Sequence, residues 1–153
     1  YGFYGPMEAA LYECELIPEG FDQGARTKTP TLLHDLDALG LNEQAIGALP
    51  RCAELPTLDT PAACLGALYV LEGATLGGQV LRREMAQRLD VNADNGGAFL
   101  NVYGAETGRR WKDFLDYLGR LPLDAPAKQR AVEAARSTFR CFEQWLDSQE
   151  VLL

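Results

Sequence analysis

The sequence LGALYVLEGATLGGQVLRR, residues 65–83, decides the fold, because it combines helical patterning with four glycines. Each glycine inside a helix costs about 1 kcal/mol relative to alanine, so tertiary contacts must offset roughly 4 kcal/mol in this segment. Gly66, Gly73 and Gly77 are seven and four residues apart, which places them on one helix face and leaves that face without side chains. A bare face of this kind serves either close packing against another helix or contact with a flat or bulky ligand. The adjacent Gly77 and Gly78 also favour a kink.

The rest of the chain carries helical patterns with recognisable starts and stops. The expected helices cover residues 1–16, 29–39, 42–49, 60–89, 98–102, 106–118 and 124–146. Thr29, Thr60 and Asp124 are expected to cap three of them, each with a proline in the first turn. Gly40 is expected to end the helix that starts at Thr29, Gly119 is expected to end the helix at residues 106–118, and residues 94–97 form a turn. The pattern predicts an all-α protein with a single domain over residues 1–153.

Composition narrows the class of function. Apolar residues make up 47% and charged residues 24% of 153 positions, which is ordinary for a globular domain. Lys and Arg total 14 against 22 acids, a net charge of −8, so we expect no nucleic-acid partner. The sequence shows neither a signal-peptide pattern nor an uninterrupted apolar run of about 20 residues, so we expect a cytoplasmic protein without membrane contact. The four cysteines form no CxxC pair, and we interpret them as reduced structural thiols.

The single histidine limits which metal and catalytic sites the chain can form. A carboxylate-bridged di-iron site needs two Glu-x-x-His pairs, which this chain cannot supply. His34 lies on the helix expected at residues 29–39, where the leucines at positions 32, 33, 36 and 39 define the buried face. We therefore expect His34 to face solvent without a role. The chain also has neither GxGxxG nor P-loop glycine spacing.

Four segments resemble bacterial haem oxygenases, particularly those associated with bacteriophytochromes. Residues 68–81, LYVLEGATLGGQVL, resemble the distal helix of that family. Residues 26–40 resemble the helix before it, residues 99–114 the next segment, and residues 134–142 the last helix. Nearly the whole chain is covered. The resemblance implies a single-domain haem-oxygenase-like helical bundle with a glycine-kinked distal helix.

The resemblance also implies a reaction. The family cleaves haem with dioxygen and reducing equivalents to biliverdin, carbon monoxide and ferrous iron, so haem is both the substrate and the oxygen activator. Gly73, Gly77 and Gly78 correspond to the distal glycines, whose bare backbone lies over the macrocycle. Many family members have an aspartate after the first of these glycines, whereas this chain has Ala74. Thr75 is therefore a candidate anchor for ordered water, although a helical threonine commonly bonds back to its own helix.

Further site residues follow from the same resemblance. Lys112 is the candidate partner of a haem propionate and Arg109 is an alternative. Phe139 is most simply a core residue, and it is also a candidate for contact with a haem edge. An acidic electron donor, such as a ferredoxin or a reductase, is expected to bind the basic residues Arg82, Arg83, Arg26 and Lys28. We expect Glu72 to pair with a neighbouring arginine or to reach solvent.

No residue of this chain is assigned as the iron ligand. Family members bind iron through a proximal histidine in a first helix that would precede Tyr1, and His34 lies in a different segment. We therefore expect the sequence to be the later part of a longer chain. The alternative is a haem-oxygenase-like protein that binds haem or a bilin without degrading it.

Overall fold

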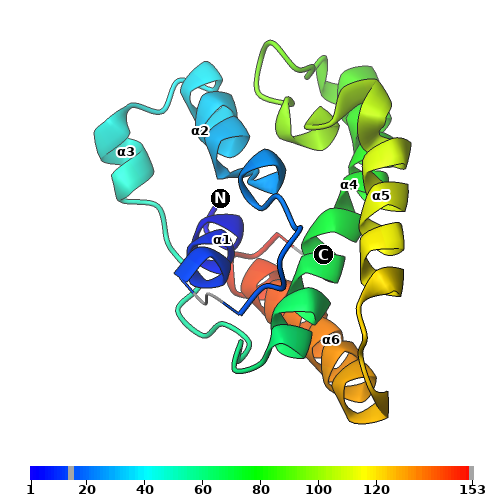
Figure 1. The fold of residues 1–153 in the computed structure, drawn as a ribbon. Coiled ribbons are helices and arrows are strands. Elements are labelled where there is room, and N and C mark those ends of the chain that lie inside the picture. Colours follow the sequence, from blue (N-terminus) through cyan, green and yellow to red (C-terminus); the bar gives the residue numbers. More distant parts are fainter. Residues whose placement is uncertain (14–15, 152–153) are drawn as a thin grey trace.

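A computed structural model describes residues 1–13 and 16–151 of the chain (Figure 1). Its six α-helices are α1 (Tyr4–Glu13), α2 (Thr29–Ala38), α3 (Glu43–Gly47), α4 (Pro61–Leu89), α5 (Thr107–Arg120) and α6 (Ala125–Ser148). Three 3₁₀ turns join them: η1 (Gly24–Arg26), η2 (Phe99–Asn101) and η3 (Gly104–Glu106). Strands are absent from the described residues, which confirms the all-α prediction.

The glycine-bearing helix α4 is the centre of the bundle. It packs most extensively against α6 and also contacts η2 and α5. In Figure 1, α4 runs beside α5 and crosses α6. The Thr60 hydroxyl accepts a hydrogen bond from the Ala63 N–H at 3.1 Å, and Asp90 ends the helix in the left-handed region at φ 53°. Both ends lie where the sequence predicts them, and the helix is continuous through its four glycines.

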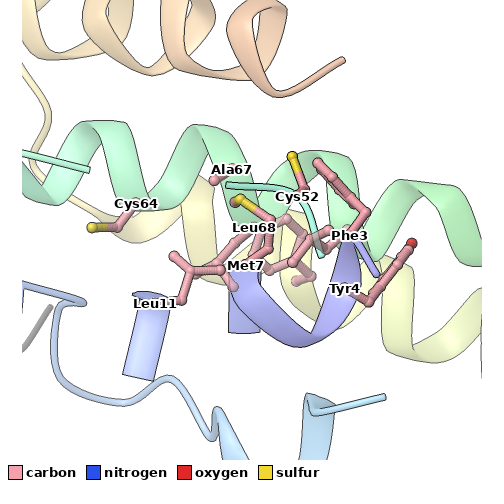
Figure 2. Close-up of a cluster of buried hydrophobic side chains, with 10 residues drawn as sticks. Phe3, Tyr4, Met7, Leu11, Cys52, Cys64, Ala67 and Leu68 are labelled. Carbon is pink, nitrogen blue, oxygen red and sulfur yellow. The ribbon is translucent and has the colours of Figure 1, made fainter. Parts of the chain in front are cut away.

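The main core lies where α1 meets α4. Phe3, Met7 and Leu11 recur at helical spacing and are almost fully buried (Figure 2). Leu68 and Leu71 of α4 belong to the same cluster. This packing fixes α1 on one side of α4, and the opposite side of α4 takes no part in the cluster.

The cap of α2 differs from the prediction. Thr29 is the first residue of the helix, and its side chain does not cap it. Instead, the Glu8 carboxylate of α1 accepts hydrogen bonds from the Lys28 N–H at 2.7 Å and the Thr29 N–H at 2.9 Å. The Thr29 hydroxyl also donates to Glu8, at 2.6 Å. A carboxylate from another helix therefore satisfies the free N–H groups at this helix start.

Two further predictions were wrong, one on a helix end and one on a buried face. Gly119 does not end α5, which continues to Arg120. Leu39 is not part of a buried face, because 56% of its surface is exposed, whereas Asp35 is buried. Asp35 accepts hydrogen bonds from the N–H groups of Ala98 and Phe99, at 2.8 and 2.7 Å, and so holds η2 against α2. The first helix is seen from Tyr4 to Glu13, and residues 14 and 15 lie outside the described part.

By length and composition alone, α4 is apolar enough to cross a membrane. Half of its most apolar window is buried inside the bundle. The same property is found in the core helix of a globular protein, and α4 occupies that position here.

Candidate functional site

The four glycines of α4 have different surroundings. A Cβ atom at Gly66 would collide with the main-chain oxygen of Ala131 in α6. At Gly78 it would lie 3.0 Å from the main-chain oxygen of Leu100. These two glycines therefore allow close packing, one of the two uses that the sequence left open.

The other two glycines lie on an uncovered face. A Cβ atom at Gly77 would meet nothing within 4 Å, and one at Gly73 would only touch the Trp111 ring at 3.4 Å. Tyr69, Leu76 and Val80 recur with them at helical spacing and are 41%, 40% and 62% exposed. Exposed apolar side chains together with bare backbone form a surface suited to a flat apolar ligand. We call this surface, residues 69, 73, 76, 77 and 80, the glycine face.

A groove of about 540 Å³ adjoins the glycine face and shares Tyr69 with it. Its walls come from α4, α5 and α6, and include Leu65, Leu118, Val132 and Phe139. Pockets for small organic ligands occupy about 300–1,000 Å³ and have mostly apolar walls. The groove has the size and lining of such a pocket.

Trp111 of α5 forms the edge between the glycine face and the core. Its ring lies 5.2 Å from the Tyr69 ring in an edge-to-face arrangement and 5.9 Å from the Phe114 ring. Phe114 is fully buried, so this aromatic chain ties Trp111 to the core. Trp111 is thereby held against Gly73.

A buried ionic network lies directly behind the glycine face. Glu72 precedes Gly73 and is 2% exposed. Its carboxylate binds the Arg26 guanidinium, the Lys28 ammonium at 2.6 Å and the Tyr103 hydroxyl at 2.9 Å. A buried charge with several partners of this kind is costly to disturb, because removing one partner leaves the others uncompensated.

The network also affects a neighbouring acid–base group. Burial, followed by the negative charge of Glu72, raises the pKa of Tyr103 above its ordinary value of 10.0. Tyr103 therefore stays neutral across the physiological range, and its hydroxyl donates a hydrogen bond to the Glu72 carboxylate.

The ionic network contradicts the predicted role of two basic residues, Arg26 and Lys28. Arg26 and Lys28 were expected to bind an electron donor at the surface, but Lys28 is 1% exposed and both bind Glu72. Glu72 pairs with an arginine as expected, although it does not reach solvent. Arg83 is exposed, and Arg82 is partly buried with an Nε that has no partner among the described residues.

The other predicted site residues are Thr75, Lys112, Arg109 and Phe139, and they do not form one cluster. The Thr75 hydroxyl donates to the main-chain oxygen of Glu72 at 2.7 Å, the back-bonding common for a helical threonine. Lys112 is exposed and pairs with Asp116 at 2.7 Å, while Arg109 is exposed and pairs with Glu106. Neither basic residue is among those that line the groove, whereas Phe139 is, with 56% of its surface exposed.

Sequence reasoning missed two parts of the site. One is the contribution of Tyr69 and Trp111 to the wall beside Gly73. The other is a pair of cations, Lys128 and Arg136, that line the groove from α6. The spacing of these cations with Val132 and Phe139, at four, eight and eleven residues from Lys128, was the signal that could have revealed them.

His34 is exposed on α2, which contacts α1 and η2. It lies outside both the glycine face and the lining of the groove. The expectation of a solvent-facing histidine is confirmed.

Comparison with known proteins gives one family. A family model described as haem oxygenase matches residues 21–148, which include α2 to α6, the glycine face and the groove. No curated protein and no solved structure matches the chain. The matched region is most of the sequence, and family membership indicates a haem-binding or haem-degrading function. The chain belongs to the haem oxygenase family.

Proposed function

We propose that this protein cleaves haem with dioxygen and reducing equivalents to biliverdin, carbon monoxide and ferrous iron. The observation that carries the proposal is the uncovered glycine face, where Gly77 has no neighbour and Gly73 meets only Trp111. Haem has a flat apolar ring, and the bare backbone at Gly73 and Gly77 allows close contact with it. The family match supports the same ligand.

The residues around the glycine face fit such a substrate. Tyr69, Leu76 and Phe139 are exposed apolar side chains that would be removed from water by a bound macrocycle. Burial of apolar surface contributes about 25 cal/mol per Å². Covering these side chains with the macrocycle would therefore supply much of the binding free energy. These residues bind the ring and exclude water from it, while haem itself supplies the oxygen chemistry.

The protein must also position water for proton delivery. The Thr75 hydroxyl donates to the main-chain oxygen of Glu72, so its own oxygen remains free to accept a hydrogen bond from water. We propose that Thr75 anchors ordered water in this way. The buried Glu72 network holds the helix backbone beside it.

Electrons must come from a separate donor, which we propose is a ferredoxin or a reductase. Arg83 is the exposed member of the four basic residues that the resemblance suggests for donor binding. An acidic donor would be attracted to it through charge complementarity.

A specific observation supports the alternative, a haem- or bilin-binding protein without catalysis. The described residues place no histidine on the glycine face, and His34 is exposed on α2. A ligand held only by apolar and ionic contacts would bind there without being oxidised.

The proposed haem site on the glycine face is tested by placing a bulky side chain in it. Gly77→Leu should fold, because a side chain at Gly77 meets nothing within 4 Å, but should block the ring and weaken haemin binding at least tenfold. The matched control is Ala86→Leu, which adds the same side chain at an exposed position on the opposite side of α4. Haemin affinity is measured from the Soret band. Unchanged affinity in Gly77→Leu would exclude the glycine face as the haem site.

A further inference from the structure

We propose that Lys128 and Arg136 of α6 bind the propionate carboxylates of the tetrapyrrole at the groove beside the glycine face. The inference rests on the proposed function, since it takes a tetrapyrrole as the ligand. It adds an anchoring site that differs from Lys112 and Arg109, the residues suggested by family resemblance.

The groove is positively charged. Among the residues that the structure describes, Lys128 and Arg136 are the only charged ones that line the groove, and the other lining residues are apolar side chains, Tyr69 and glycines. No carboxylate of residues 1–13 and 16–151 lines it, although the full chain has 22 acids and 14 Lys and Arg residues. An apolar groove that carries only positive charge fits a ligand with an apolar body and an anionic edge.

Lys128 and Arg136 are available to a ligand. Within residues 1–13 and 16–151, neither Lys128 nor Arg136 forms an ion pair. Arg130, on the same helix, instead pairs with Asp59. A ligand carboxylate would therefore not have to displace a protein carboxylate from Lys128 or Arg136.

Lys128 and Arg136 lie on one side of α6. The two residues are eight positions apart, about 12 Å along the helix axis at 1.5 Å per residue. Val132, Ala135 and Phe139 share the same side of α6 and line the groove with them. Both cations have long, flexible side chains, so their charged ends can approach one edge of a ligand whose apolar body rests on these residues. The Arg136 guanidinium can also hold a carboxylate through two parallel hydrogen bonds.

The residues suggested by resemblance are less available. Lys112 pairs with Asp116 and Arg109 pairs with Glu106, both on exposed surface and outside the groove lining. A propionate bound there would compete with a neighbouring carboxylate. The observed pairs therefore favour Lys128 and Arg136.

The test compares two ligands that differ only in their carboxylates. Haemin and haemin dimethyl ester are titrated by the Soret band into the wild-type chain and the variant Lys128→Met/Arg136→Met. Loss of two exposed charge contacts should raise the Kd for haemin about tenfold. The Kd for the dimethyl ester should not change, because this ligand lacks the negative charges. Arg140→Met is the matched control, because Arg140 is an exposed cation of α6 outside this groove.

The outcomes separate this inference from the proposed function. An unchanged Kd for haemin in the double variant, or an equal loss for both ligands, would overturn the role of Lys128 and Arg136 and leave the proposed function intact. Failure of the wild-type chain to form any Soret complex would overturn the proposed function and this inference with it. Circular dichroism of each variant confirms that the helices are retained.

Discussion

The Arg26 side chain binds the Glu72 carboxylate and also donates to the main-chain oxygen of Arg110 at 3.3 Å. Glu72 precedes Gly73, and Arg110 precedes Trp111. One largely buried side chain therefore connects both sides of the contact between Gly73 and Trp111. The shape of the glycine face depends on this connection as well as on the glycines themselves.

Removal of the Glu72 charge should destabilise the protein strongly. Glu72→Gln leaves Arg26 and Lys28 buried without their carboxylate, and such changes typically cost about 3–5 kcal/mol. Urea unfolding measures the loss. The control is Glu106→Gln, which removes the carboxylate of an exposed pair with Arg109 and should cost less than about 1 kcal/mol. Equal losses in the two variants would contradict the structural importance of the network.

The glycines should respond to alanine with opposite signs. Gly77→Ala should stabilise the protein by about 0.5–1 kcal/mol, because the helix gains propensity and the new methyl meets nothing. Gly66→Ala should destabilise it by about 1–3 kcal/mol or more, because the methyl collides with the backbone of α6. Thermal unfolding of both variants measures the difference. A destabilised Gly77→Ala would show that this position is packed, contrary to the structure.

The cap that Glu8 provides should be worth more than a local cap. Glu8→Ala removes acceptors for three hydrogen bonds at the start of α2 and should cost about 2 kcal/mol, the upper end of measured cap losses. The comparison is Asn42→Ala, which removes a single exposed cap bond to Ala45 and should cost about 0.5–1 kcal/mol. Chemical denaturation provides both values. A smaller loss for Glu8→Ala than for Asn42→Ala would contradict the structural account.

Stability should decline at alkaline pH. Burial raises the pKa of Tyr4 and of Tyr103 above 10.0, so both stay neutral in the folded protein where the unfolded chain already ionises. Their contribution is complete below pH 10 and is lost as the pH rises further, because the unfolded state releases protons more readily. The free energy of unfolding should therefore fall above pH 10, and less steeply in Tyr4→Phe. An identical slope in wild type and Tyr4→Phe would contradict this assignment.

The parts of the fold that sequence predicted are those governed by local interactions. Thr60 and Asp124 cap α4 and α6 as expected, because each bonds an N–H three residues ahead. The cap from Glu8 lies about twenty residues from its helix, and Arg26 is 46 residues from Glu72. Periodicity within one helix contains no information about such partners, so Lys28 was interpreted as a surface residue. Gly119 was read as a stop because glycine often follows helices, but α5 continues through it with no neighbour to prevent this.

The candidate site also combines features that the spacing within one helix predicts with features that depend on contacts between helices. Spacing alone placed Gly66, Gly73 and Gly77 on one face, but only packing shows that Gly66 lies against α6 while Gly77 is open. The groove depends on three helices and could not be found from any one of them.

The most direct test of the central claim is turnover. Haemin is added to the native-length protein under air with ascorbate, and the Soret band is followed together with the red absorption of biliverdin. The account predicts a one-to-one complex whose Soret band decays as biliverdin appears. A Soret band that never forms, or one that forms and persists under reduction, would contradict the proposed catalysis.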